Sequence, residues 1–382
     1  MKSNTAAKIK GFATPQGTER FRDRFLNRPA ERFAGSHFRK GGDLWFSSVG
    51  LGTYLGEPDE STDRLYEQVI RQSLTSGINV IDSAINYRAQ RSERAIGRAI
   101  RDLIGRGTVS REEIILSTKG GFLPFDGSYP VDPAGYFQTE YLDTGLLDSR
   151  HIAQGCHAMS PRYLEDQLNR SLENLGMETI DLYYLHNPET QLSDVDRGEF
   201  AGRLRAAFEF LERMVSQGRI RMYGTATWSG YRVSSQSRQH LSLEEMVALA
   251  KEAGGSRHHF RAVQLPVNVA MPEAWNFPNQ AVGGKREPFL KCARHFDILT
   301  MASASLLQGR LSRLPFQQLR ELFPGLETPS QACLQFARSC PGVVTALVGM
   351  RRGEHLMENL AVARVPAMDE SQMVRLFQRN QG

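Results

Sequence analysis

Residues 160–186 have the sequence SPRYLEDQLNRSLENLGMETIDLYYLH and contain one complete helix–strand unit. The pair Ser160-Pro161 is typical of a helix start, because serine caps free N–H groups and proline fits the first turn. Leucines then recur at helical spacing until a glycine ends the stripe, at Leu164, Leu168, Leu172, Leu175 and Gly176. Residues 180–186 are mostly apolar, with Asp181 near the start and His186 at the end, which indicates a parallel strand buried on both faces.

The same unit recurs along the chain. Buried strands are predicted at eight places, residues 47–53, 78–82, 114–119, 180–186, 220–226, 262–267, 298–303 and 343–349. Amphipathic segments between them predict helices, among them residues 61–77, 95–104, 200–215, 243–253, 286–296, 329–338 and 354–363. Eight such units in succession predict an α/β fold, a closed (β/α)8 TIM barrel. The alternative is an open doubly wound sheet, whose usual glycine-rich fingerprint is missing after the first strand.

Two segments interrupt this pattern. Residues 1–37 predict a basic extension ahead of a barrel domain at residues 38–382, which opens with a small hairpin around Gly41-Gly42. The first forty residues carry ten lysines and arginines against three acids, with Phe12, Phe21 and Phe25 between them. Such an arm could bind nucleic acid or an anionic surface, or direct the chain to an organelle. We favour a surface extension that packs loosely on the domain, with no nucleic-acid partner.

The second segment is a long loop after the third predicted strand, at residues 120–159. It is rich in glycine, proline, aspartate and tyrosine and has little helical period. Loops of this length are often functional, and in a barrel this one would lie at the carboxyl-terminal face. A cover for the substrate and a contact between subunits both remain open, and the sequence does not predict an oligomeric state.

Composition excludes several classes of protein. The apolar runs are too short to span a bilayer, and residues 1–10 lack the apolar segment of a secretory signal. The four cysteines are scattered and form no Cys-x-x-Cys pair: Cys156, Cys292, Cys333 and Cys340. We therefore expect a cytoplasmic protein without membrane contact or disulfides. The cluster of His151, Cys156 and His157 matches no standard ligand set, so no metal is expected.

Polar residues stand where three neighbouring strands end. Asp82, Lys119 and His186 end the second, third and fourth predicted strands, and Tyr87 follows Asp82 in its loop. Each alone could be a helix cap or a satisfied ion pair, but a barrel brings all four together. Tyrosine, with an ordinary pKa of about 10, becomes a better proton donor to a nascent alkoxide when an ammonium lowers its pKa. A carboxylate keeps that buried lysine charged, and a histidine N–H can hold the substrate oxygen.

These residues carry a resemblance to the aldo-keto reductase family. The segment from Ile81 to Tyr87, followed by Ser92-Glu93, resembles the family's motif around its catalytic Asp and Tyr. The segments ending in Lys119 and His186 resemble the strands with the catalytic Lys and His. The similar segments run from about residue 38 to 363 in the family's order. The resemblance implies NADPH-dependent reduction of an aldehyde or ketone, with Tyr87 as general acid, and does not exclude NADH.

The resemblance also implies where the cofactor binds. It places the family's opening turn at Gly52 and Thr53 and a contact with the nicotinamide at Gln264. It also implies that Gln308 and Gly309 lie along the pyrophosphate, and that Gly349, Glu358 and Asn359 contact the adenosine. Arg351 and Arg352 stand where a 2′-phosphate would be met, although two solvated surface arginines remain an alternative. Three positions depart from the family's usual residues, namely Thr227, Ser303 and His355. Aromatic residues near the mouth, Tyr54, Phe122 and Trp228, are candidates for contact with a small carbonyl substrate.

Three other functions remain open. A barrel that binds NADPH without turnover could act as a sensor or regulatory subunit on a partner. A Schiff-base aldolase would also use a strand-end lysine such as Lys119, but it would not need the cofactor segments. The same site could also oxidise an alcohol, because one site catalyses both directions.

Overall fold

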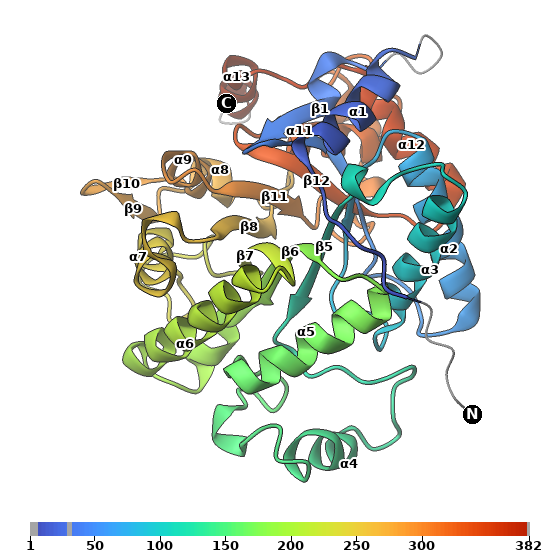
Figure 1. Ribbon diagram of the computed structural model, residues 1–382. Helices are drawn as coiled ribbons and strands as arrows, with labels where there is room; N and C mark the ends of the chain where they lie inside the picture. The colour runs from blue at the N-terminus through green and yellow to red at the C-terminus, as the bar shows by residue number, and fades with distance from the viewer. Residues whose placement is uncertain (1–6, 29–32, 380–382) are drawn as a thin grey trace.

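The computed structural model describes residues 7–28 and 33–379. The predicted strands close into one parallel barrel in the order β11-β12-β3-β4-β5-β6-β7-β8 (Figure 1). The barrel strands are β3 (Val49–Gly52), β4 (Val80–Asp82), β5 (Ile115–Gly120), β6 (Ile180–His186), β7 (Ile220–Ala226), β8 (Phe260–Pro266), β11 (Leu299–Ser303) and β12 (Val343–Gly349). Because β12 pairs with β3, the sheet has no open edge, and the doubly wound alternative is excluded.

A helix follows each barrel strand. These helices are α2 (Glu60–Thr75), α3 (Arg91–Gly105), α5 (Pro161–Leu175), α6 (Arg197–Ser216), α7 (Leu243–Gly254), α9 (Phe289–His295), α11 (Pro329–Ser339) and α12 (Gly353–Leu360). Their apolar faces and the outward side chains of the strands form one large buried cluster. A second cluster, which includes Val80, Ile115, Leu182 and Met301, fills the inside of the barrel. The barrel is therefore packed between two apolar layers, as its continuous apolar strands predict.

Local sequence sets most of the element boundaries. Helix α5 begins at Pro161 and ends before Gly176, whose φ of 63° is the left-handed conformation that glycine adopts most easily. Helix α2 is capped by Asp59, which accepts a hydrogen bond from the Thr62 N–H at 2.7 Å, rather than by Ser61.

The helix predicted at residues 286–296 is shorter than expected. It begins only at Phe289, and the preceding residues form a hairpin of β9 (Gln280–Val282) and β10 (Lys285–Glu287). Gly283 and Gly284 cause this difference, because their φ angles of 56° and 77° form a tight two-residue hairpin turn.

The amino-terminal end of the barrel is closed by three elements. These are α1 (Pro15–Leu26) and the predicted hairpin, which consists of β1 (Phe38–Gly41) and β2 (Leu44–Ser47). Phe21 and Phe25 lie four residues apart on one face of α1 and are buried with Phe38. The Ala13 N–H donates to the Asp181 carboxylate at 2.6 Å. The expectation of loose packing is therefore wrong for residues 7–28.

The charges of the arm also contact the barrel. Arg20 pairs with Glu112 at 2.8 Å, and Arg24 pairs with Glu113. Residues 1–6 and 29–32 of the predicted extension lie outside the described residues, as do residues 380–382 at the other end of the chain. The division of the chain at residue 37 stays a prediction.

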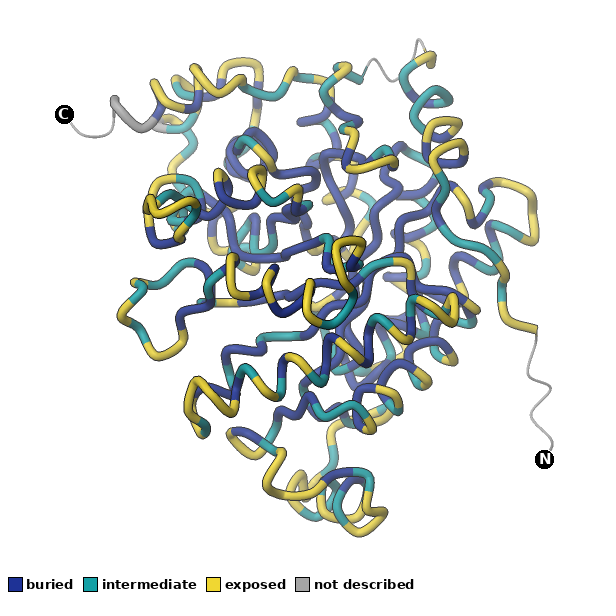
Figure 2. Tube along the Cα trace, turned by 60° about the vertical axis from the view of Figure 1, so that its left-hand side comes forward, coloured by how far each residue is buried: buried dark blue, intermediate teal, exposed yellow. Residues whose placement is uncertain are grey.

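The loop at residues 120–159 is an ordered appendage. It contains α4 (Pro133–Phe137), which projects from the barrel beyond α5 (Figure 1), and much of its surface is exposed (Figure 2). Its base is closed by a bridge between Phe122 and His157. Its apolar side chains form a separate cluster that includes Leu123, Tyr141 and Leu147 and packs on Tyr163 of α5.

Three further helices connect or follow the barrel units, namely α8 (Glu273–Asn276), α10 (Phe316–Arg320) and α13 (Glu370–Arg379). Within residues 7–28 and 33–379, no helix has the length and apolar character needed to cross a membrane.

Candidate active site

A cleft of about 870 Å³ opens at the carboxyl ends of the barrel strands. Its lining contains most of the predicted site residues, namely Gly52, Thr53, Tyr54, Asp82, Tyr87, Phe122, His186, Thr227, Trp228, Gln264, Ser303, Gln308, Gly309, Gly349, Arg351, His355, Glu358 and Asn359. Two predicted residues, both within the described part of the chain, are not in the lining. Lys119 is buried behind Asp82, and Arg352 is exposed just before α12. The fold thus brings residues from all parts of the chain to one cleft.

Asp82 and Lys119 form a buried ion pair at the base of this cleft. Lys119 Nζ lies 2.6 Å from Asp82 Oδ2 and donates to the Ser83 carbonyl, also at 2.6 Å. The other oxygen of Asp82 accepts from Ser117 Oγ at 2.7 Å and from Gln264 Nε2 at 2.9 Å. Burial opposes the charge of Lys119, but Asp82 and Tyr87 outweigh it and raise the lysine pKa. Lys119 is therefore held in its charged form beneath Tyr87, with its charge balanced by Asp82.

Tyr87 lies directly over this lysine. The ammonium of Lys119 is 4.8 Å from the centre of the Tyr87 ring, and Tyr54 packs edge-on against that ring at 5.0 Å. Burial raises the pKa of Tyr87, and the opposing effect of Lys119 does not cancel it. The lowering of the tyrosine pKa that the sequence analysis expected is thus present as one contribution but is outweighed by burial.

His186 faces Tyr87 from the end of β6. The two rings are 5.9 Å apart, and Phe122 packs on the other side of His186 at 5.0 Å. Burial, followed by the charge of Lys119, lowers the pKa of His186 well below its ordinary value, so its imidazole is neutral. Its Nδ1 atom is buried and has no hydrogen-bond partner within the described residues. A neutral imidazole in this position can donate one N–H to a bound oxygen atom.

The long loop supports His186 from behind. His157 Nε2 lies 2.7 Å from the His186 carbonyl, and Gln191 Nε2 lies 2.8 Å from His157 Nδ1. The Gln191 amide is a donor, so His157 accepts at Nδ1 and donates from Nε2. Of the loop residues 120–159, all of which the structure describes, only Phe122 lines the cleft. The loop therefore supports the site at its base, and the rest of it does not cover the cleft.

The lining of the cleft also has features of a binding site for a polar ligand. Three buried side-chain oxygens in the lining lack partners among the described residues: Asn86 Oδ1, Thr227 Oγ1 and Asn359 Oδ1. The turn after β11 has positive φ at Ala304, Leu307, Gln308 and Gly309, of 51°, 47°, 54° and 82°. Strained backbone and unsatisfied buried polar atoms are both concentrated where proteins bind ligands.

Some predicted cofactor residues already have partners. Gln264 donates to Asp82, and Glu358 accepts from Thr328 Oγ1 at 2.7 Å. Arg351 is exposed at the edge of the cleft. It lies close to Gly56, because a Cβ atom built on that glycine would be 3.1 Å from Arg351 Nη1.

The model of the aldo/keto reductase family matches residues 48–269, more than half of the chain. The chain belongs to the aldo/keto reductase family. Among curated relatives, "Uncharacterized oxidoreductase YqkF" of Bacillus subtilis is 24% identical, and the match covers 87% of this chain and 92% of the relative. "Putative voltage-gated potassium channel subunit beta" of Schizosaccharomyces pombe is 22% identical, with 83% and 84% covered.

Solved structures of the aldo/keto reductase family share the fold. An aldo/keto reductase from Klebsiella pneumoniae in complex with NADP and acetate has a TM-score of 0.60 at 21% identity, covering 91% of this chain and 95% of that one. The holo form of AKR11C1 from Bacillus halodurans has a TM-score of 0.60 at 20% identity, covering 89% and 95%. At these identities the likeness concerns the fold alone.

Several residues that line the cleft were not predicted from the sequence, namely Asn86, Asn187, Ser305, Leu306, Ser312 and Ser330. Asn86 and Asn187 adjoin Tyr87 and His186 in the sequence, so the ends of the strands could have indicated them. Ser312 and Ser330 reach the cleft only through the fold, and no local pattern indicates them.

Glu189 is a further residue that the sequence analysis missed. Its Oε1 atom accepts from the backbone N–H groups of Trp228 and Ser229 at 2.8 and 3.0 Å. This carboxylate thereby fixes the loop that carries Trp228, whose side chain is 45% exposed at the mouth. Tyr54 is 53% exposed at the same mouth, so the entrance to the cleft is aromatic.

No three His, Cys, Asp or Glu side chains within residues 7–28 and 33–379 are grouped as a metal site requires. His157 is engaged with His186 and Gln191.

Proposed function

We propose that this protein reduces an aldehyde or ketone to an alcohol with NADPH, and that Tyr87 donates the proton. The observation that carries the proposal is the meeting of Tyr87, the Lys119–Asp82 pair and His186 in one cleft of an aldo/keto reductase barrel. NADPH, when bound, supplies the hydride. The solved relatives in complex with NADP and NADPH support this choice of cofactor.

Each residue of the group has a separate task in this proposal. The neutral imidazole of His186 donates a hydrogen bond to the carbonyl oxygen and orients it toward Tyr87. As the carbonyl carbon gains the hydride, the oxygen takes the phenolic proton of Tyr87. Lys119 then stabilises the phenolate that remains, and Asp82 keeps Lys119 charged and in place. Solvent restores the proton of Tyr87 afterwards.

The raised pKa of Tyr87 is compatible with its proposed role as the proton donor in reduction. A proton donor must carry its proton, and a tyrosine with a raised pKa carries it throughout the neutral range. Oxidation of an alcohol would need the phenolate instead. We therefore expect the rate of reduction to stay flat through neutral pH and to fall only in strongly alkaline solution.

The remaining residues of the cleft lining fit an extended dinucleotide. In the proposal, Thr53, Gln264 and Ser303 lie near the nicotinamide, and Gln308 and Gly309 lie along the pyrophosphate. Glu358 and Asn359 meet the adenosine. The unpartnered oxygens of Thr227 and Asn359 support such a ligand, because buried polar atoms are rarely left unsatisfied. Arg351 is the candidate for the 2′-phosphate, since it lies in the lining and Arg352 does not.

The first experiment separates cofactor binding from turnover. Purified protein is titrated with NADPH and NADH while its fluorescence is followed, and a panel of aldehydes is then added while absorbance at 340 nm is recorded. Tyr87→Phe is expected to bind NADPH like the wild type but to lose about 100-fold or more of its turnover. Wild-type turnover in Tyr87→Phe would show that another group donates the proton.

A matched pair of variants tests the phosphate contact. Arg351→Ala is expected to weaken NADPH binding by about tenfold while leaving NADH binding unchanged, because it removes one charge-assisted contact. Arg352→Ala, one residue further along the chain and outside the lining, is the control and should change neither affinity. If the two variants behaved alike, Arg351 would not be the phosphate contact.

The relative from Schizosaccharomyces pombe supports a second candidate function. Its name describes a channel subunit, so this chain could bind NADPH on the same fold as a regulatory subunit. Tight NADPH binding without turnover on any carbonyl or alcohol would favour this function over the reductase. We keep the cytoplasm as the proposed compartment, because all four cysteines are free thiols.

A further inference from the structure

The backbone directly after Tyr87 is strained. Arg88, Ala89 and Gln90 all have left-handed conformations, with φ angles of 51°, 51° and 67°. Residues other than glycine adopt this conformation at a cost of roughly 1–3 kcal/mol each. Three in succession therefore require contacts that hold them in place.

The side chain of Arg88 supplies such contacts. Its guanidinium is fully buried, and it donates from Nε to the Glu57 carbonyl at 3.0 Å and from Nη2 to the Asp59 carbonyl at 3.3 Å. It also forms an ion pair with Asp63 and lies over the ring of Tyr66, 5.1 Å from its centre. One side chain thus joins the strained turn to the β3–α2 loop and to the first turns of α2.

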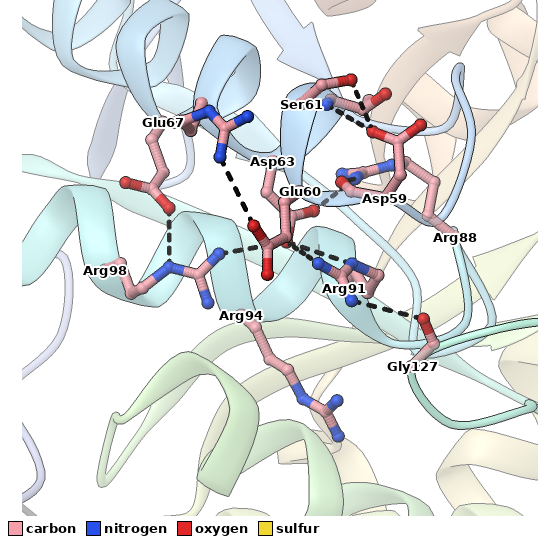
Figure 3. A network of polar contacts seen from close by, with 12 residues as sticks. Asp59, Glu60, Ser61, Asp63, Glu67, Arg88, Arg91, Arg94, Arg98 and Gly127 are labelled. Carbon is pink, nitrogen blue, oxygen red and sulfur yellow. Dashed lines mark hydrogen bonds and ion pairs between the residues drawn. The ribbon is translucent and has the colours of Figure 1, made fainter.

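Asp63 receives two further arginines. Figure 3 shows Arg91 and Arg98 of α3 reaching the same carboxylate, at 2.8 and 3.3 Å. The side chain of Asp63 is 8% exposed, whereas that of Arg98 is 49% exposed. Because Asp63 keeps two cationic partners without Arg88, loss of Arg88 does not leave a buried carboxylate unpaired. The contribution of Arg88 can therefore be tested separately from that of Asp63.

The strained turn also contacts the long loop. The Gly127 N–H donates to the Ala89 carbonyl at 2.9 Å, and Gln90 Nε2 donates to the Phe125 carbonyl at 3.1 Å. The β3–α2 loop that Arg88 binds begins beside Tyr54, whose ring packs on Tyr87. Three segments around Tyr87 therefore meet at the turn of Arg88, Ala89 and Gln90.

We propose that Arg88 is a positioning residue for Tyr87: by binding the β3–α2 loop and Asp63, it holds residues 88–90 left-handed and so fixes Tyr87 over Lys119. The inference rests on the proposed function, since it assigns Tyr87 the role of proton donor. Arg88 itself is buried away from the cleft lining and acts only through the backbone.

The test compares Arg88→Met with Arg98→Met, which removes a half-exposed partner of the same carboxylate. Arg88→Met is expected to lower kcat by about 100-fold with NADPH affinity unchanged, because small displacements of a reacting group have effects of this size. Arg98→Met should change kcat by less than about twofold. Equal kcat in the wild type and Arg88→Met would overturn the proposal.

A second substitution separates positioning from general stability. In the double variant Arg88→Met/Ala89→Gly, glycine removes strain from the turn, because it adopts left-handed angles without cost. We expect this variant to regain part of the lost kcat, about tenfold. A purely structural role of Arg88 would instead predict no recovery or a further loss, and that result would contradict the proposal.

Hydrogen exchange gives a measurement that does not depend on turnover. The amides of residues 84–92 in the free protein should exchange faster in Arg88→Met than in the wild type. Their exchange rates in Arg98→Met should equal those of the wild type. If the wild type had no turnover on any carbonyl, the proposed function would fail, and the exchange data would still decide whether Arg88 holds the turn. Unchanged exchange in Arg88→Met would show that it does not.

A milder variant serves if Arg88→Met does not accumulate as folded protein. The ammonium of Arg88→Lys can pair with Asp63 but cannot reach the Glu57 and Asp59 carbonyls at the same time. It should show a smaller loss of kcat, about tenfold, with faster exchange in residues 84–92. Wild-type values for both would overturn the proposal.

Discussion

Each end of the barrel contains a buried ion pair, and the two pairs are similar in distance, burial and number of hydrogen bonds. At the amino-terminal end, Arg111 and Asp181 are 2.7 Å apart, with side chains 4% and 2% exposed. At the carboxyl-terminal end, Lys119 and Asp82 are 2.6 Å apart, with side chains 1% and 5% exposed. Both carboxylates accept two further hydrogen bonds, Asp181 from Ala13 and Leu116 and Asp82 from Ser117 and Gln264.

What differs is the surroundings of each pair. The remaining bonds of Arg111 go to the carbonyls of Ile114 and Thr179, and the arm at Ala13 closes that end. Lys119 instead lies under Tyr87, which faces the cleft. Burial and a short ion-pair distance therefore do not distinguish a structural pair from a functional one. The functional pair is distinguished by a second titratable group, Tyr87, which lies between the pair and an open cleft.

The largest effect is expected from Lys119→Met. Without the ammonium, nothing offsets the cost of forming a buried phenolate at Tyr87, so kcat should fall by about 1,000-fold. Single-turnover reduction measured with saturating NADPH checks this. A loss below about tenfold would mean that the two ion pairs do not differ in function.

The matching change at the closed end is Arg111→Met. It leaves the Asp181 charge buried and should lower the free energy of unfolding by about 3–5 kcal/mol. The kcat of the folded fraction should stay within about twofold of the wild type. Urea unfolding and initial rates below the transition measure the two quantities. A large loss of kcat in fully folded Arg111→Met would contradict the comparison.

Acid should destabilise the closed end through His37. Burial lowers the pKa of this histidine from 6.5 to about 3. Because the folded pKa lies below the unfolded value, the contribution to stability is present above pH 6.5 and is lost as the pH falls toward 3. The loss is about 1.4 kcal/mol per pH unit for one such group.

The variant His37→Gln tests this contribution. Its plot of unfolding free energy between pH 6.5 and 4 should be flatter than that of the wild type by about that slope. An unchanged slope would assign the acid sensitivity to other groups, such as His157 at the open end, whose pKa burial lowers to about 4.

The smallest effect is expected from Arg20→Ala on the arm. The Arg20–Glu112 pair is about half exposed, with side chains 54% and 50% accessible. Such pairs contribute less than about 1 kcal/mol, and salt weakens them further. Thermal unfolding at low and high salt should show a difference near the limit of detection. A clear destabilisation would mean that the charges of the arm hold the closed end together as much as its phenylalanines do.

Local patterns predicted the barrel well. The predicted strand at residues 180–186 coincides with β6, because a strand buried on both faces has a mostly apolar sequence. The meeting of Asp82, Lys119 and His186 was also predictable, since parallel strands place their ends at one face.

Other features depend on contacts that no local pattern encodes. The docking of Phe21, the strain after Tyr87 and the net pKa of that tyrosine all depend on side chains far along the chain. The hairpin at Gly283-Gly284 is an exception, because a glycine pair indicates a tight two-residue turn and could have been recognised.

The hydrogen bond from Ala13 to Asp181 has a consequence for the order of synthesis. The two residues are 168 positions apart. At typical translation rates the ribosome takes on the order of ten seconds to make that length of chain. During this time α1 has been synthesised but its acceptor on β6 does not yet exist. Helix α1 can therefore pack on the nearby β1–β2 hairpin early, but the segment before it gains its anchor on β6 only after this interval.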